Sequence, residues 1–168
     1  MLDFVAKLHL DKIGKKEVSC EVRSDMKIKI KRFDKNHALP KHETEGAAAF
    51  DLRARETVEI LPGKVGYVPL NIATETPPDH FLMLAARSGT HKKGLMPANG
   101  FGIVDPDFSG DGDEIKSAYY NFTDKPVVVE AGERIAQAMF VKFVRAEWDE
   151  VDHLENKTRG GFGTTGKK

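Results

Sequence analysis

An acidic stretch near the middle of the chain has the residue types that could activate a water molecule or hold a metal ion. It reads NGFGIVDPDFSGDGDEI over residues 99–115. The apolar pair before Asp105 predicts a short strand that ends at this carboxylate, and Pro106 favours an extended backbone at the residue before it. Alternation along an extended chain would place Asp107 on the same face as Asp105. Three interpretations fit: a catalytic general base, a metal-binding loop, or an exposed turn.

A calcium loop of the helix–loop–helix kind is excluded by the spacing within this stretch. Such a loop needs oxygen ligands at fixed positions and a glutamate at the twelfth position. Counted from Asp105, the twelfth residue is Lys116. A general base in a phosphate-binding pocket and an exposed acidic turn therefore remain.

The tripeptide that follows the apolar stretch HFLMLAA could bind an anion. Arg87, Ser88 and Gly89 place a guanidinium group, a hydroxyl group and a permissive backbone side by side. Arginine binds oxyanions in a fork geometry, and glycine lets the backbone approach a ligand closely. An ordinary turn with a surface arginine has the same pattern, so both interpretations stand.

Three further stretches hold polar or aromatic residues where a ligand could bind. Arg134 and Gln137 lie in GERIAQAMF, Asp51 lies in GAAAFDL, and Phe162 lies among glycines in RGGFGTTG. The first two also fit strands whose polar side chains meet solvent, and the third fits a disordered tail. Glycines that wrap phosphate oxygens, and a phenylalanine that packs on a base, would instead give the tail a binding role.

The composition limits the classes of function. The chain has 168 residues, with 26 basic and 26 acidic side chains that cancel in charge. Neutrality argues against binding to long nucleic acid but allows a compact anionic ligand. A single cysteine allows no intrachain disulfide and favours a reducing cytoplasm. No apolar run approaches the roughly 20 residues of a membrane span, and the charged start does not resemble a secretory signal.

Short strands must position these residues. The stretch 26–33 alternates apolar and basic residues, and 80–87 is typical of a buried strand. Residues 58–77 predict a strand, a Pro-Gly turn and a second strand, and 114–144 predict three strands joined by two turns. Turn signals that recur roughly every 8–12 residues indicate an all-β sandwich or barrel.

The two ends of the chain differ from this middle region. Residues 1–25 have apolar positions that fit neither the helix period nor the strand period, so a short helix and an added edge strand are equally expected. Residues 155–168 are rich in glycine and polar residues and are expected to form a flexible lid. The β domain is therefore expected over residues 26–154.

Five stretches in order resemble the motifs of the trimeric deoxyuridine triphosphatase (dUTPase) family. They are GAAAFDL, ARSG, NGFGIVDPDF, GERIAQ and RGGFGTTG, and the resemblance covers about residues 26–166. It implies a jelly-roll-like β-clip fold and a homotrimer whose active sites each draw on all three subunits. It also implies hydrolysis of dUTP to dUMP and pyrophosphate, with Mg²⁺ as the cofactor.

The resemblance also implies a role for each matching residue. Asp105 matches the aspartate that activates the water attacking the α-phosphorus, and Asp51 would lie in the outer sphere of a Mg²⁺ ion carried by the triphosphate. Asn99 would read the uracil edge, Phe108 would pack on the deoxyribose, and Phe162 would close over uracil. The residues implied to bind the substrate are Arg87, Ser88, Gly89, Asn99, Phe108, Gln137, Lys157, Arg159, Phe162 and Gly163.

The sequence departs from the family pattern in four places, one of which is the turn after Arg87, Ser88 and Gly89, which is one residue short. Phe108 stands where the family has a tyrosine, so the stacking surface is kept and the hydroxyl group is lost. The acidic residues 109–114 lengthen the turn after it. Lys157 and Arg159 both stand near the position of the arginine in the tail, so either could meet the γ-phosphate.

Two other functions are compatible with parts of this pattern. A dCTP deaminase shares the fold and a similar DPxFSG run, but its catalytic glutamate would fall at Ala118, three residues before Asn121. A dUTPase-like regulator would bind protein partners through residues 1–25 or 109–114.

Overall fold

The computed structural model describes residues 26–160, which form β-strands and one short 3-10 helix. The strands are β1 (Lys29–Arg32), β2 (Phe50–Arg53), β3 (Val58–Ile60), β4 (Val65–Pro69), β5 (Ile72–Glu75), β6 (His80–Ala86), β7 (Leu95–Pro97), β8 (Gly102–Val104), β9 (Lys116–Asn121), β10 (Val127–Val129) and β11 (Arg134–Lys142). The helix, η1, spans Thr90–Lys93 and follows β6.

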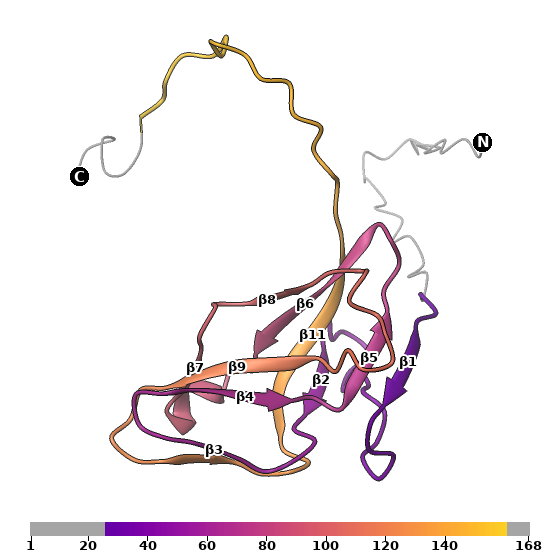
Figure 1. Cartoon of the computed structure of the whole chain (residues 1–168), viewed down its shortest axis with the longest axis vertical. Coiled ribbons are helices and arrows are strands. Elements are labelled where there is room, and N and C mark those ends of the chain that lie inside the picture. Colours follow the sequence, from indigo (N-terminus) through magenta and orange to yellow (C-terminus); the bar gives the residue numbers. More distant parts are fainter. Residues whose placement is uncertain (1–25, 161–168) are drawn as a thin grey trace, which may run out of the picture.

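Two main sheets form the body of the molecule. The larger sheet has the strand order β2-β11-β6-β8, and the smaller has the order β4-β9-β7. Two strand pairs, β1-β5 and β3-β10, complete the structure, and all pairings are antiparallel. In Figure 1 the smaller sheet lies in front of the larger one. The predicted all-β, jelly-roll-like fold class is confirmed.

Strand periodicity explains where the core lies. Along β9, Ser117, Tyr119 and Asn121 are buried, and the residues between them point outward, as a period of two requires. The inner face of β9 meets buried side chains of the larger sheet, such as Leu52 and Ile135, in one hydrophobic cluster. This core holds the two sheets together and fixes the strand ends that carry the candidate site.

The prediction of one long strand after the Pro-Gly turn in 58–77 was wrong, because β4 and β5 are separate strands. Asn71 between them has a φ of 68°, which is the left-handed region that breaks a strand. Asparagine tolerates this conformation better than most residues. Its side-chain oxygen accepts a hydrogen bond from the Asp34 backbone N–H at 2.6 Å, and its amide donates to the Asp34 carbonyl at 2.9 Å.

Tyr119→Phe is expected to lower the free energy of unfolding by about 1 kcal/mol, because the buried hydroxyl donates a hydrogen bond to the Ile135 carbonyl at 2.8 Å. Burial raises the pKa of Tyr119 above its ordinary value of 10.0. The folded state therefore holds this proton more tightly than the unfolded chain. The resulting stability is present below about pH 10 and is lost as pH rises through the folded pKa.

Urea unfolding between about pH 8 and pH 11 measures this effect. The matched control is Tyr120→Phe, because Tyr120 lies on the opposite face of β9. Equal losses of stability in the two variants would contradict the assignment to the buried hydroxyl.

The chain leaves the body after β11. Residues 143–160 form no strand or helix, and from Val144 onward they run away from the sheets as an extended arm (Figure 1). Trp148 on this arm is 90% exposed. Within residues 26–160, no helix is long and apolar enough to cross a membrane. The expectations for residues 1–25 lie outside the described part of the chain.

Candidate active site

Three adjacent strands of the larger sheet bring the first group of candidate residues together. Asp51 on β2 and Gln137 on β11 are direct cross-strand partners, and Ala85 on β6 is the partner of Gln137 on the other side. Arg87 comes two residues after Ala85, so it returns to the same face of the sheet. The Gln137 side-chain amide donates to the Ala86 carbonyl at 2.9 Å, which fixes the strand end that leads to Arg87.

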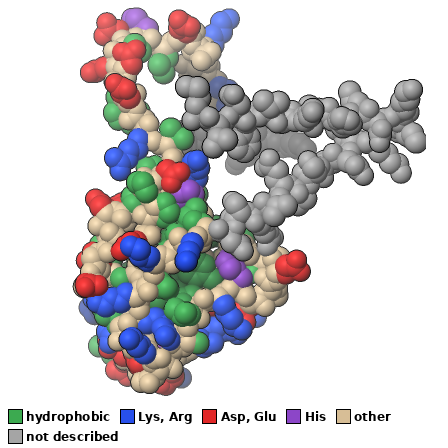
Figure 2. Space-filling view, turned by 90° about the vertical axis from the view of Figure 1, so that its right-hand side faces the viewer, with side chains coloured by type: hydrophobic (Ala, Val, Ile, Leu, Met, Phe, Trp, Pro, Cys, Tyr) green, Lys and Arg blue, Asp and Glu red, His purple; other side chains and the backbone are tan. Residues whose placement is uncertain are grey.

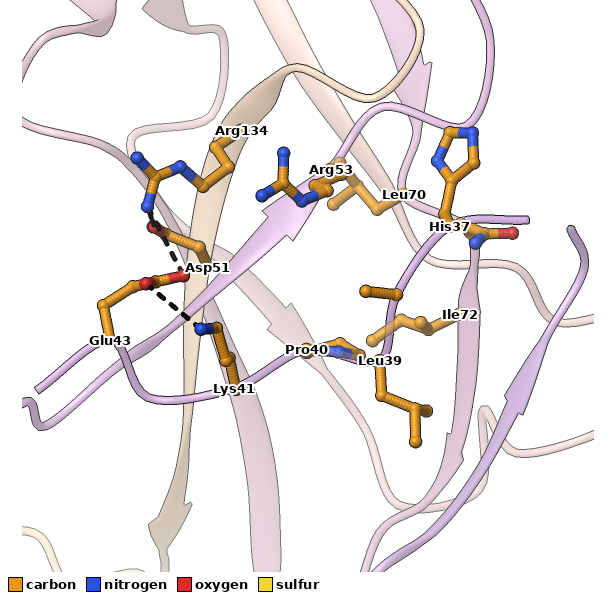
Figure 3. Close-up of a pocket in the computed structure, with 12 residues that line it drawn as sticks. His37, Leu39, Pro40, Lys41, Glu43, Asp51, Arg53, Leu70, Ile72 and Arg134 are labelled. Carbon is orange, nitrogen blue, oxygen red and sulfur yellow. Dashed lines mark hydrogen bonds and ion pairs between the residues drawn. The ribbon is translucent and has the colours of Figure 1, made fainter. Parts of the chain in front are cut away.

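The carboxylate of Asp51 is the centre of this group. Its two oxygens accept hydrogen bonds from Arg87 Nε at 2.8 Å and from Arg134 Nη1 at 3.0 Å. Arg134 also lies 3.4 Å from a carboxylate oxygen of Glu43, and Figure 3 shows Glu43, Asp51 and Arg134 close together. The Asp51 side chain is only 14% exposed. The group therefore presents two oriented guanidinium groups that share the Asp51 carboxylate, while Glu43 pairs with both Arg134 and Lys41.

The stretch GERIAQAMF indicated Arg134 only as a possible ligand contact, the family resemblance implied no role for it, and no pattern indicated Glu43. Arg134 stands in the same short stretch as Gln137, which is the only signal that indicated it. Glu43 lies in the segment before β2 and carries no local pattern.

Ser88 and Gly89 lie in the turn between β6 and η1. Both are exposed, and the Thr90 backbone N–H donates to the Arg87 carbonyl at 3.0 Å to close the turn. A Cβ atom built on Gly89 would meet nothing within 4 Å. The turn therefore presents open surface beside the arginine pair, where an anion could approach.

The second group of candidate residues lies on the connection from β7 to β8. Gly100 has a φ of 74° in the turn that reverses the chain, and a Cβ atom on Gly102 would lie 3.2 Å from Leu84 on β6. Glycine therefore suits both positions. Asn99 is exposed beside this turn and lines a cavity of about 190 Å³ together with Ala118.

Asp105 and Phe108 follow β8 and line a neighbouring open groove of about 550 Å³. Phe108 is 42% exposed, so its ring offers a face to a ligand. The expected alternation of Asp105 and Asp107 was wrong, because the chain turns at Pro106. The Phe108 backbone N–H donates to the Asp105 carbonyl at 3.1 Å, and proline favours the second position of such a turn.

The two groups lie at opposite ends of β6. Leu82 pairs with Val104, so Asp105, the next residue of that chain segment, lies beside Phe81 near the start of β6. Arg87 directly follows the last residue of β6, at its opposite end. At about 3.4 Å per residue, six residues of strand separate the two ends by roughly 20 Å. One chain therefore does not bring Asp105 to its own Arg-Ser-Gly turn.

The tail residues are only partly within the described chain. Lys157 and Arg159 are exposed on the extended arm. Phe162 and Gly163 lie outside the described residues.

The position that would carry the deaminase glutamate has only a methyl group. Ala118 lines the same cavity as Asn99. Asn121, three residues further on, is buried, and its amide donates to the carbonyls of Ile60 and Lys125 at 2.8 and 2.7 Å. Asn121 therefore organises the turn after β9, and this wall offers no carboxylate at position 118 for deamination chemistry.

Within residues 26–160, no three His, Cys, Asp or Glu side chains gather closely enough to hold a metal ion directly. Asp51 already engages two arginines. A cation beside Asp51 therefore fits this group only if water or a ligand supplies most of its coordination.

The fold and the two groups define a class of protein: an all-β subunit with candidate residues at two separated places, one of which presents a pair of oriented arginines. The family model described as dUTPase matches residues 35–166 of the chain. The deoxyuridine 5'-triphosphate nucleotidohydrolase of Helicobacter pylori (strain P12) is 40% identical over 146 residues, covering 84% of this chain and 97% of the relative. The chain belongs to the dUTPase family.

Solved structures agree with this assignment. The crystal structure of dUTPase from Streptococcus mutans has a TM-score of 0.64 and 32% identity, covering 71% of this chain and 98% of that chain. The dUTPase of Staphylococcus bacteriophage 80alpha with dUpNHpp has a TM-score of 0.72 and 22% identity, covering 83% of this chain and 98% of that chain. The second comparison shows the shared fold alone.

Proposed function

We propose that this protein hydrolyses dUTP to dUMP and pyrophosphate. The observation that carries the proposal is the match of the dUTPase family model to residues 35–166, which contain all five motif-like stretches. The assay is release of pyrophosphate from dUTP in the presence of Mg²⁺, with dCTP and UTP as competing substrates. Turnover of dCTP to dUTP, or no turnover of dUTP, would contradict the proposal.

Asp105 is the general base in this proposal. A carboxylate is a weak base at neutral pH, so Asp105 acts by orienting the attacking water and by its negative charge. Its exposed position after β8 suits this role, because the carboxylate faces an open groove that a nucleotide could enter. Such a base contributes about 10²–10⁴-fold to the rate.

The other group binds the phosphates. Arg87, Ser88 and Gly89 supply a guanidinium group, a hydroxyl group and exposed backbone, and Gln137 holds the end of β6 in place. Arg87 and Arg134 both pair with Asp51, and the neighbouring Glu43 pairs with Arg134 and Lys41. These carboxylates offset most of the local cationic charge, so the negative charge of a bound triphosphate is left largely without a partner. Mg²⁺ carried by the triphosphate, with Asp51 in its outer sphere, would neutralise that charge.

The active site is completed between subunits of a homotrimer. The roughly 20 Å between the two ends of β6 support this, because each chain must meet a partner to join Asp105 with an Arg-Ser-Gly turn. Exposed apolar side chains on and beside the outer face of the smaller sheet also support contact with another copy. They are Val65, Tyr67, Met96, Phe101 and Ile103.

The distribution of surface charge supports a small nucleotide as the partner, and the cysteine content supports a location in the cytoplasm. On the face shown in Figure 2, Lys, Arg, Asp and Glu side chains are interspersed over the body of the molecule. Mixed charge of this kind suits a small nucleotide rather than long nucleic acid or a membrane. The single cysteine suits the reducing cytoplasm.

Phe108→Ala is expected to let UTP be hydrolysed. Asn99 reads the uracil edge in this proposal, and the Phe108 ring packs on the deoxyribose and leaves no room for a 2′-hydroxyl group. Loss of the ring should reduce the preference for dUTP over UTP by about tenfold or more. The ratio of kcat/KM for the two nucleotides measures this. An unchanged ratio would assign sugar discrimination to another residue.

Truncation after Glu155 is expected to lower kcat/KM by about 10²-fold and to leave the fold intact. The described part of this tail is exposed, so its removal costs no core packing. In this proposal Phe162 and Gly163 close over the nucleotide, and Lys157 or Arg159 meets the γ-phosphate, as a lid does. Circular dichroism and sedimentation separate loss of catalysis from loss of folding. A truncated protein that unfolds would make the tail structural.

A further inference from the structure

Three carboxylates line the groove that holds Asp105 and Phe108: those of Asp105 itself, Asp113 and Glu114. We infer that Glu114 is a positioning residue that holds the segment bearing Asp105 and Phe108 in register with the β4–β5 turn. The inference rests on the proposed function, because it assigns Glu114 an effect on the hydrolysis of dUTP. It also gives the acidic residues 109–114 a role other than binding an ion or a protein.

One oxygen of Glu114 receives two hydrogen bonds from outside its own segment. Arg55 Nε donates to Glu114 Oε1 at 2.8 Å, and the Asn71 backbone N–H donates to the same atom at 3.0 Å. The Glu114 side chain is only 8% exposed. The hydrogen bond that Arg55 donates to Glu114 also raises the pKa of Arg55, so its guanidinium group keeps its charge. A carboxylate that is buried to this extent and accepts hydrogen bonds from these two donors has little freedom to move.

The partner of Glu114 is itself held firmly. Asn71 is 3% exposed and has the left-handed backbone conformation described above. Its side chain binds both the N–H and the carbonyl of Asp34. A backbone conformation of this kind persists when its surroundings determine it from several sides. Glu114 therefore binds to a fixed point of the fold rather than to a mobile loop.

The segment between Phe108 and Glu114 is closed by its own hydrogen bonds. The Gly110 backbone N–H donates to Asp113 Oδ2 at 2.7 Å, and the Asp113 N–H donates to the Gly110 carbonyl at 3.1 Å. Lys31 on β1 donates to the Asp111 carbonyl at 2.6 Å. Any shift at Glu114 is therefore passed to Phe108 and Asp105 through a short, turn-rich connection.

The backbone of Ile115, the residue after Glu114, is also hydrogen-bonded to the β4–β5 turn. The Ile115 backbone N–H donates to the Ile72 carbonyl at 2.9 Å, and the Ile115 carbonyl accepts from the Leu70 N–H at 2.9 Å. These bonds lie on both sides of Asn71. The Glu114 carboxylate therefore binds the turn between these two bonds, at the Asn71 backbone N–H.

The test uses the full chain and three variants. Glu114→Ala removes both hydrogen bonds. Glu114→Gln keeps a side-chain carbonyl that can accept from Asn71 and loses only the charge. The control, Glu75→Ala, removes an ion pair of the same 2.8 Å length, between Lys29 and Glu75, at a site away from the groove.

Glu114→Ala is expected to lower kcat for dUTP about tenfold and to reduce the dUTP/UTP preference about tenfold, because small displacements of reacting groups are costly. Glu114→Gln should recover most of both quantities, and Glu75→Ala should match the unaltered protein. Amide hydrogen exchange should become faster at Asn71 and in residues 105–110 in Glu114→Ala alone.

Two results would overturn the inference. One is a Glu114→Ala protein that melts at a lower temperature but keeps the dUTP/UTP preference, because that change would be structural only. The other is unchanged hydrogen exchange in residues 105–110. Failure of the proposed function is distinguishable, since the unaltered protein would then release no pyrophosphate from dUTP while the exchange difference persisted.

Discussion

Asp105→Asn is expected to lower kcat for dUTP by about 10²–10⁴-fold while leaving nucleotide affinity nearly unchanged. Asparagine has the same shape as aspartate, but it is neither a base nor an anion. Asp105 is exposed at the end of β8, so the substitution removes no buried interaction. Single-turnover hydrolysis measures the chemical step, and calorimetric titration with a non-hydrolysable dUTP analogue measures binding.

The matched control for this experiment is Asp107→Asn. Asp107 lies in the same turn and is exposed in the same way, but it has no role in the proposed chemistry. Its activity should stay close to that of the unaltered protein. If Asp105→Asn keeps more than about a tenth of the activity, Asp105 is not the base.

Mixing two inactive variants is expected to restore activity if active sites are shared between subunits. Asp105→Asn lacks the base, and Arg87→Ala lacks the phosphate-binding guanidinium group. A site that takes Asp105 from one subunit and Arg87 from another is intact when both contributors are unaltered at those positions. Random assembly of equal amounts makes about one half times one half, or roughly a quarter, of the sites intact. The mixture is denatured and refolded together, and dUTP hydrolysis is then measured.

The control for this mixture pairs two lesions in the same half of the site. Arg87 directly follows β6, and Gln137 lies on the neighbouring strand β11 of the same chain. A site therefore takes both residues from one copy, and every copy in this mixture lacks one of them. This mixture should stay inactive. Recovery in the control, or no recovery in the test mixture, would contradict a site completed between subunits.

Local sequence patterns predicted most of the strands and the positions of candidate residues. Alternation predicted β1, and the turn residues between 114 and 144 separated β9, β10 and β11 where the structure has them. Arg87 and Asp105 each directly follow a strand, because an apolar run finishes just before them. These features depend on neighbours in the chain, which a single sequence displays directly.

Long-range contacts could not be predicted in the same way. The ion pair between Arg134 and Asp51 joins residues 83 positions apart, and the bond from Asn71 to Glu114 spans 43 positions. These contacts depend on the order of the strands in the sheets. The periodic pattern of apolar residues along the chain does not indicate that order. The left-handed turn at Asn71 also depends on its bonds to Asp34, so no local pattern indicated that the predicted strand would break there.

The extended arm has a practical consequence. Trp148 is the chain's one tryptophan, and it stands 90% exposed on that arm. Indole emission shifts to shorter wavelength when water around the ring is replaced by protein. The native chromophore can therefore report, without any added dye, whether the arm has found a surface to lie against.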